Sequence, residues 1–331
     1  MIEEVFSHIF RMEIPLPGNP LKAINSYLIQ GKGRNLMIDT GMNRVECMDA
    51  MQSSLRELQV DLKRTDFFIT HLHADHLGLV SELAQEESKI YFNYPDTEII
   101  NNPTHWEEMG ASASKNGFPE SDIQGALSRH PGRKYHARQP LNLTFLGEGD
   151  LLRIGEYSFQ CVETPGHTRG HMCLYEPRTK IFFSGDHILN DITPNISLWT
   201  ENYNPLKQFL QSLDKIDRLQ IDRVLPGHRR PFNDHRRRIA ELKKHHELRN
   251  EEVIAILQKG RLNAYQVAGQ MTWDIDCDRW GDFPLPQQWF ASGEALAHLQ
   301  YLQGEGRVLK ETQDGKVVFS LAKGSINSMK G

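Results

Sequence analysis

The chain of 331 residues has 39% hydrophobic and 24% charged residues, proportions typical of a globular protein with a sizeable core. It has no run of about 18 apolar residues, which excludes a membrane-spanning helix, and Glu3 and Glu4 stand where a signal peptide would carry Lys or Arg. The formal net charge of -5 argues against a protein that mainly coats nucleic acid. We therefore expect a cytoplasmic protein with no membrane partner.

The cysteine spacing agrees with a reducing compartment. Cys47, Cys161, Cys173 and Cys277 are far apart and form no C-x-x-C pair. This spacing excludes a zinc ribbon or a thioredoxin-like motif, and so few cysteines in so long a chain do not indicate a disulfide scaffold. Reduced, buried thiols in a cytosolic protein are the expected state.

Up to residue 228 the chain alternates between predicted strands and helices, which indicates an α/β fold. Short apolar runs predict strands at residues 27–29, 36–38, 67–70, 89–93, 151–154, 157–163, 172–175, 181–184 and 223–225. Helical spacing of apolar residues predicts helices over about 44–59, after 77 and over about 205–218. Hairpins in both halves favour mixed rather than purely parallel sheets.

Residues 98–140 interrupt this alternation. They are polar and rich in Gly, Pro and aromatic residues, with two weakly helical pieces around Trp106 and Ile123. So long an irregular stretch in a compact domain is usually a functional loop rather than core. We expect either a cover over a pocket, with His105 and Trp106 reading the substrate, or a surface decoration that packs its own aromatic side chains.

The composition changes after residue 228. A basic, helical stretch covers residues 229–249, either as a solvated linker helix or as a phosphate contact. The elements predicted after it are helices over about 247–258, 264–270 and 292–303 and a hairpin of strands 307–312 and 316–321. Three helices followed by a hairpin is the order of a winged helix. We therefore expect a main domain over 1–240 and a winged-helix-like α+β domain over 241–331.

Histidines and acidic residues gather directly after several predicted strands. The first group is the segment THLHADH at residues 70–76, where His71 and His73 share one side of an extended segment. Asp75 and His76 follow where the chain turns into a helix. Three more groups follow later strands and contain His167 and His171, Asp186 and His187, and His228.

These groups are expected to form one metal site. Ligands at the ends of several strands in one α/β body can converge on one edge of a sheet. Gly166, Gly185 and Gly227 stand beside them, where a larger side chain would crowd the metal. Imidazole and carboxylate ligands together suit Zn, Fe or Mn.

The pattern H-x-H-x-D-H, followed by His, Asp and His, resembles the metallo-β-lactamase superfamily over roughly the first two-thirds of the chain. The resemblance implies an αββα sandwich with two divalent metal ions, Zn first and Fe or Mn as alternatives, at one edge between the sheets. It also implies that Asp39 supports the site from behind the ligands. The implied ligands are His71, His73 and His167 for the first metal, Asp75, His76 and His228 for the second, and Asp186 as a bridge.

This ligand set implies hydrolysis. Two cations about 3.5–4 Å apart lower the pKa of a shared water to about 7, so a bridging hydroxide can attack an ester, thioester, lactone or phosphodiester. Asp75 is expected to be the catalytic residue that orients the hydroxide and receives its proton. His171 and His187 each lie near an implied ligand and are expected either to face the substrate or to pack.

Asp186, the implied bridge, stands where the best-known secreted β-lactamases carry a Cys. A ligand set with a bridging Asp instead resembles that of glyoxalase-II-like thioesterases, lactonases and nucleases of the superfamily. We expect a dinuclear metal-dependent hydrolase of a small-molecule ester, thioester or lactone. One alternative is an endoribonuclease, because the C-terminal domain resembles the tail of the β-lactamase-like endoribonuclease. Another is a persulfide dioxygenase, which shares T-H-x-H-A-D-H but uses one iron.

The third helix of the C-terminal domain separates these alternatives. A nucleic-acid-binding winged helix usually presents Lys or Arg on that helix. Residues 292–306 contain two glutamates and neither Lys nor Arg. RNA is therefore a disfavoured partner, and we expect a structural role or a homodimer interface instead.

Overall fold

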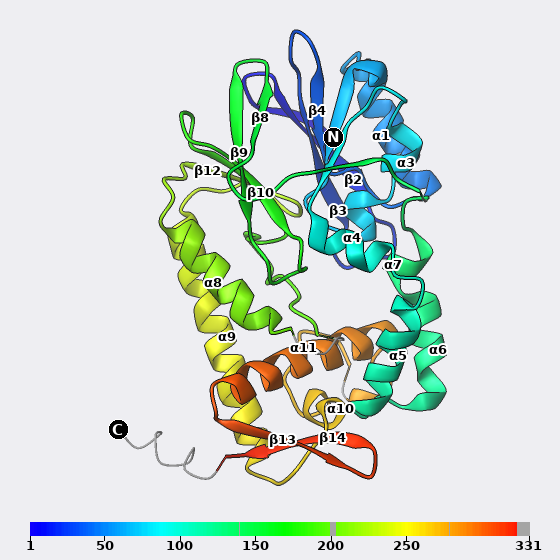
Figure 1. Ribbon diagram of the computed structural model, residues 1–331, viewed down its shortest axis with the longest axis vertical. Coiled ribbons are helices and arrows are strands. Elements are labelled where there is room, and N and C mark those ends of the chain that lie inside the picture. Colours follow the sequence, from blue (N-terminus) through cyan, green and yellow to red (C-terminus); the bar gives the residue numbers. More distant parts are fainter. Residues whose placement is uncertain (139, 199–202, 278, 323–331) are drawn as a thin grey trace. The chain divides into compact units, whose positions relative to one another are not determined.

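The computed structural model describes residues 1–138, 140–198, 203–277 and 279–322 (Figure 1). The chain divides into two compact units, each of which is described by itself. The first unit consists of Met1–Asn101, Pro131–Pro194 and Ser212–Ile239, and the second of Asn102–His130, Asn195–Gln211 and Ala240–Gly331. The last junction between the units, Ile239/Ala240, lies next to the domain boundary predicted at 240/241. That boundary stays a prediction, because the second unit also contains two earlier segments of the chain.

Two mixed sheets form the centre of the first unit, as predicted. The seven-stranded sheet contains, in spatial order, β1 (Ile2–Phe6), β2 (Ile9–Pro15), β3 (Ala23–Ile29), β4 (Asn35–Ile38), β5 (Thr65–Phe68), β6 (Ile90–Phe92) and β7 (Leu143–Phe145). The five-stranded sheet contains β8 (Leu151–Ile154), β9 (Tyr157–Glu163), β10 (Met172–Glu176), β11 (Ile181–Gly185) and β12 (Arg223–Pro226), in the reverse spatial order. Strands β4 to β7 pair in parallel, as do β11 and β12, and the other pairs are antiparallel.

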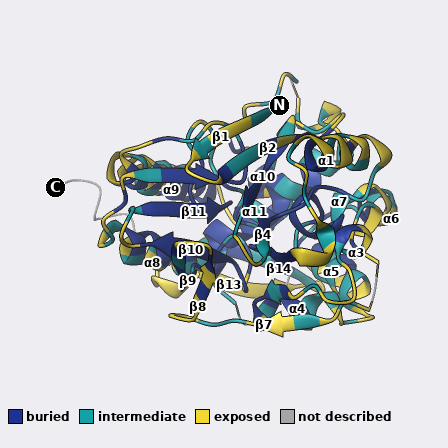
Figure 2. Ribbon diagram, turned by 90° about the horizontal axis from the view of Figure 1, so that it is seen from above, coloured by how far each residue is buried: buried dark blue, intermediate teal, exposed yellow. Residues whose placement is uncertain are grey.

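A hydrophobic core fills the space between the two sheets. Tyr27 on β3 meets Phe183 on β11 edge to face, with ring centroids 5.2 Å apart, and Phe159 on β9 packs on Phe183 at 5.6 Å. Strands β10 and β11 are buried along their whole length, which Figure 2 shows in dark blue. Burial on both faces explains why these strands read as continuous apolar runs.

Helices cover the outer faces of the sheets. On the seven-stranded sheet a second core packs Met37 and Phe67 against Met51 of α1 (Val45–Glu57). The short helices of this unit are η1 (Leu62–Arg64), α2 (Ala74–Leu77), α3 (Val80–Leu83), α4 (Tyr94–Ile100) and α7 (Pro131–Lys134). Beside the five-stranded sheet, Lys215 of α8 (Pro205–Asp217) donates a 2.6 Å hydrogen bond to the carbonyl of Glu163. The predicted αββα layering is thus confirmed.

The two weakly helical pieces predicted around Trp106 and Ile123 are confirmed, but the prediction that residues 98–140 as a whole are irregular is wrong, because most of the stretch is helical. Helices α5 (His105–Lys115) and α6 (Glu120–Arg129) belong to the second unit. Their apolar sides pack on Trp289, which is far away in the sequence and 1% exposed. This distant partner supplies the burial that the weak local pattern lacks. The Trp106 ring meets the rings of His105 and His130 at steep angles, so it packs with its own aromatic neighbours.

The C-terminal part of the second unit has the predicted order of three helices and a hairpin. Its elements are α9 (His235–Leu257), which contributes to both units, α10 (Ala264–Ala268), η2 (Trp280–Asp282), α11 (Leu285–Gly304), β13 (Val308–Gln313) and β14 (Lys316–Leu321). Helix α9 begins later than predicted, because Phe232 pairs with Val224 and holds the preceding residues in a turn. Helix α11 begins earlier, because a proline is tolerated in the first turn of a helix. No helix in the described part of the chain is long and apolar enough to span a membrane.

Candidate metal centre

The ends of strands in the first unit bring together all seven predicted ligands. The segment after β5 carries His71, His73, Asp75 and His76, and the β9–β10 connection carries His167. Asp186 follows β11, and His228 follows β12. Three overlapping groups result, His71–His73–His167, His71–His76–Asp186 and Asp75–His76–His228, and within each group the potential ligand atoms lie within 4.8 Å of one another.

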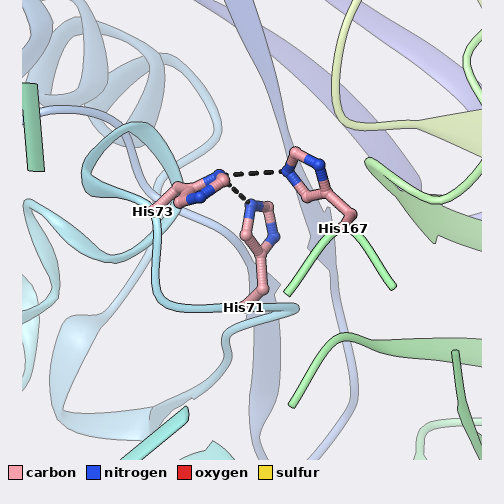
Figure 3. A group of neighbouring side chains, drawn as sticks. All are labelled: His71, His73 and His167. Carbon is pink, nitrogen blue, oxygen red and sulfur yellow. Dashed lines mark hydrogen bonds between the residues drawn. The ribbon is translucent and has the colours of Figure 1, made fainter. Parts of the chain in front are cut away.

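Three of the histidines point at one another (Figure 3). His73 Nδ1 lies 2.9 Å from His71 Nε2 and 3.0 Å from His167 Nε2. Burial, reinforced by the neighbouring imidazoles, lowers the pKa of His73 to about 3 and that of His71 well below its usual value. These rings are therefore neutral at physiological pH, which is the state that metal binding requires.

The Asp186 carboxylate lies near the Nε2 atoms of three histidines. Its Oδ2 is 3.5 Å from His76 Nε2, 3.5 Å from His228 Nε2 and 3.6 Å from His167 Nε2. Asp75 Oδ2 lies 3.3 Å from His228 Nε2. A direct N–H···O bond is about 2.9 Å long, whereas ligand atoms around a tetrahedral zinc ion at about 2.0–2.1 Å are about 3.3–3.4 Å apart. The distances around Asp186 are therefore compatible with ligand atoms around a shared cation, whereas the 2.9–3.0 Å separations within the three-histidine group are hydrogen-bond lengths.

Unpartnered polar atoms support the same interpretation. His76 Nε2, His228 Nε2 and Asp186 Oδ1 are buried and have no hydrogen-bond partner in the described part of the chain. Burial alone would lower the pKa of His228, but Asp186 and Asp75 raise it to about 10. The carboxylates thus hold positive charge in this pocket, and a divalent ion can supply that charge in place of protons. The residues present fit a metal site.

The far side of two rings is fixed by the protein. His76 Nδ1 lies 2.7 Å from Asp39 Oδ2, and Asp39 also accepts a 2.9 Å hydrogen bond from the backbone N–H of Thr70. His228 Nδ1 donates to the carbonyl of Ala23 at 2.7 Å. Such partners fix the tautomer and the orientation of a metal-binding histidine. They leave Nε2 of both rings facing Asp186, so Asp39 lies where a supporting acid is needed.

The two histidines predicted either to face substrate or to pack are both buried. His171 Nε2 accepts a 3.1 Å hydrogen bond from the backbone N–H of Asp186, and its Nδ1 lies 2.7 Å from Thr164 Oγ1. His171 is therefore held within the protein and supports the backbone at Asp186. His187 is 0% exposed and interacts with the backbone of Ser212 on α8. These positions favour packing for both residues, and a role in facing substrate stays a prediction.

One buried carboxylate at this site was missed from the sequence. Asp96 on α4 is 0% exposed and accepts hydrogen bonds from the segments that carry His73 and His167. Burial raises the pKa of Asp96 to about 6, against the opposing effect of these hydrogen bonds. No motif marks this residue, because a single Asp in a polar stretch has no local signal, and only the tertiary structure reveals its partners.

Two glycines leave the space that the predicted site requires. A Cβ atom at Gly185 would lie 2.7 Å from His171 Nε2, and one at Gly227 would lie 2.6 Å from Asp186 Oδ1. Gly185 also has a φ of +47°, a conformation that favours glycine. A side chain at either position would therefore crowd His171 or Asp186, and the prediction that it would crowd a metal stays a prediction.

The Gly227→Ala variant is expected to weaken metal binding and hydrolysis by about 10-fold to 100-fold, because the methyl group would displace Asp186. Isothermal titration with Zn²⁺ and initial rates would measure the two effects. Gly33→Ala is the matched control, since a Cβ atom there meets nothing within 4 Å. Unchanged zinc affinity in Gly227→Ala would contradict the close packing of Asp186 against this glycine.

The layers and the buried His/Asp group together define a class of protein, the two-sheet α/β metallo-hydrolases. Residues 20–228 match the sequence profile of the Metallo-beta-lactamase superfamily, and residues 282–322 match that of the Metallo-beta-lactamase-like, C-terminal domain. The chain belongs to the metallo-β-lactamase superfamily and is a metal-dependent hydrolase of that superfamily.

Curated relatives and solved structures agree with this assignment. The chain is 24% identical over 309 residues to the probable metallo-hydrolase YqjP of Bacillus subtilis, covering 90% of this chain and 93% of the relative. It is 24% identical over 225 residues to the human acyl-coenzyme A thioesterase MBLAC2, covering 64% of this chain and 75% of the relative. The metallo-beta-lactamase family protein TTHA1429 of Thermus thermophilus superimposes with a TM-score of 0.81 at 27% identity, covering 96% of this chain and all of that one (100%).

Proposed function

We propose that this protein is a dinuclear hydrolase that cleaves a small-molecule thioester, ester or lactone, with Zn as the first candidate metal and Fe or Mn as alternatives. The observation that carries the proposal is the position of Asp186 Oδ2, 3.5–3.6 Å from nitrogens of His76, His167 and His228. One carboxylate thus connects the three-histidine group with the group around His228. Among the substrate classes we place thioesters first, because one relative is an acyl-coenzyme A thioesterase.

Different residues of the chain would bind the two ions and orient the attacking water. His71, His73 and His167 would hold one ion, Asp75, His76 and His228 the other, and Asp186 both. When bound, the two ions would polarise the substrate carbonyl and activate a water molecule as nucleophile. Burial raises the pKa of Asp75, but the nearby imidazoles of His228 and His76 lower it to about 2. Asp75 therefore stays ionised at neutral pH, and its carboxylate can orient the attacking water by accepting a hydrogen bond.

A substrate panel tests this function. Protein loaded with Zn²⁺ or Mn²⁺ is offered acyl-coenzyme A thioesters, aryl esters, lactones and single-stranded RNA, and His71→Ala and the exposed His136→Ala serve as a matched pair. We expect turnover of a small substrate that is lost in His71→Ala and retained in His136→Ala. Cleavage of RNA alone would favour the endoribonuclease alternative, and turnover that survives His71→Ala would overturn the proposal.

We propose that the protein belongs to the glyoxalase-II-like branch, which is supported by the position of Asp186 Oδ2 near nitrogens of His76, His167 and His228. The C-terminal helices and hairpin support a winged-helix-like domain with a structural or homodimer-forming role, since α11 carries no Lys or Arg. Sedimentation velocity tests the dimer, and a monomer at all concentrations would contradict it. The four cysteines, which form no disulfide, support a cytoplasmic location.

A further inference from the structure

Asp96 links two segments that belong to different sheets, one that follows β5 and one that connects β9 to β10. Its Oδ2 accepts hydrogen bonds from the backbone N–H of Leu72 at 3.0 Å and from Thr168 Oγ1 at 2.8 Å. Its Oδ1 accepts from the backbone N–H of Gly170 at 2.6 Å. Three donors converge on one fully buried carboxylate, so both of its oxygen atoms are engaged.

The donors lie next to the three-histidine group along the chain. Leu72 stands between His71 and His73, in the segment that follows β5 of the seven-stranded sheet. Thr168 follows His167, in the connection between β9 and β10 of the five-stranded sheet. Each side of this histidine group is thus one residue away from a hydrogen bond to the same carboxylate.

Gly170 packs closely against Asp96. A Cβ atom at Gly170 would lie 2.7 Å from the backbone nitrogen of Asp96 and 2.8 Å from its Cγ atom. Only glycine lets the second segment come this close to α4. A backbone hydrogen bond from Met172 to the carbonyl of Thr70, 2.9 Å long, also joins the two segments, on the strand side of the histidines.

We propose that Asp96 is a positioning residue of the hydrolytic site, whose carboxylate sets the separation between the His71–His73 segment and His167. It acts on both segments through the backbone N–H groups of Leu72 and Gly170 and the hydroxyl group of Thr168. The inference rests on the proposed metal site, because the separation of these rings matters most if they share an ion. Loss of residues that orient metal ligands typically costs about 10-fold to 100-fold in metal affinity or activity.

The chemistry of Asp96 explains why the carboxylate is required. In the Asp96→Asn variant only one oxygen remains as an acceptor, and the amide group would direct its own N–H donors at one or two of the three present donors. If the oxygen keeps Leu72 and Thr168, the bond to Gly170 is lost. The link between the two segments is then weakened while the size of the side chain is unchanged.

The test compares two buried aspartates of the first unit. Asp66 is 4% exposed and also accepts three hydrogen bonds, two from Arg34 and one from the backbone N–H of Lys89. We expect Asp96→Asn to weaken cobalt binding by about 10-fold to 100-fold and to change the visible spectrum of the bound Co²⁺. Asp66→Asn should lower resistance to urea but leave the cobalt affinity and spectrum unchanged.

A milder pair keeps the proposal testable if Asp96→Asn does not fold. Thr168→Ala removes one donor and should weaken cobalt binding, and Thr168→Ser, which keeps the hydroxyl group, should restore most of it. Wild-type cobalt affinity and spectrum in Asp96→Asn and Thr168→Ala, or an equal loss in Asp66→Asn, would overturn the positioning role. Failure of the wild-type protein to bind cobalt at all would instead overturn the proposed metal site.

Discussion

Replacing Asp186 with Ala is expected to lower kcat/KM by about 10³-fold or more, which corresponds to about 4 kcal/mol of transition-state stabilisation. The physical reason is its position between the nitrogens of His76, His167 and His228. Without this carboxylate, the proposed site would lose the one ligand that its two halves would share, and the pocket would lose a negative charge that attracts cations. Initial rates with the best substrate from the panel measure the loss.

Two further variants show whether that loss is specific. Asp49→Ala removes an exposed carboxylate on α1 and should leave kcat/KM unchanged. Asp186→Asn keeps the shape and one acceptor oxygen, so we expect its activity to lie between those of wild type and Asp186→Ala. Full activity in Asp186→Ala would show that the carboxylate has no part in the reaction.

Removal of metal by a chelator is expected to abolish hydrolysis and to lower the melting temperature by about 5–15 °C. A ligand present at 100-fold to 1,000-fold its Kd stabilises a protein by about 2.7–4.1 kcal/mol, and each kcal/mol shifts the melting temperature of a domain of this size by about 2–4 °C. The stripped protein would leave His76 Nε2, His228 Nε2 and Asp186 Oδ1 buried without partners.

Differential scanning calorimetry before and after dialysis against chelator measures the shift, and added Zn²⁺ or Mn²⁺ should reverse it. Asp186→Ala is the control, because its melting temperature should respond much less to the chelator. If elemental analysis shows complete stripping while the activity and melting temperature stay unchanged, the metal has no role in this fold or its chemistry.

The sequence predicted the parts of the site that carry local signals. His71, His73 and Asp75 form a dense motif at the end of a short strand, and Gly185 and Gly227 mark tight turns beside Asp186 and His228. Alternation of strands and helices was enough to indicate the layers. These features depend on residues that are close together in the sequence, where patterns can be read directly.

The parts that were missed depend on distant partners. The sequence indicated only two weakly helical pieces around Trp106 and Ile123, and no local pattern shows the burial against Trp289 that stabilises helices α5 and α6. Asp96 is significant because of Leu72 and Gly170, which lie 24 and 74 residues away in the sequence. These two helices and the segments bound by Asp96 are held in place by contacts between residues that are distant in the sequence. Such contacts leave no pattern that can be recognised in a single sequence.

The buried His/Asp group is proposed to be a two-metal centre shared through Asp186. The most direct test is inductively coupled plasma mass spectrometry of protein purified without chelator, alongside the Asp186→Ala variant. We predict two divalent ions per chain in the wild type, with Zn as the first candidate, and at most one in Asp186→Ala. One iron per chain, as in a persulfide dioxygenase, or no bound metal in the wild type would contradict the proposed two-metal centre.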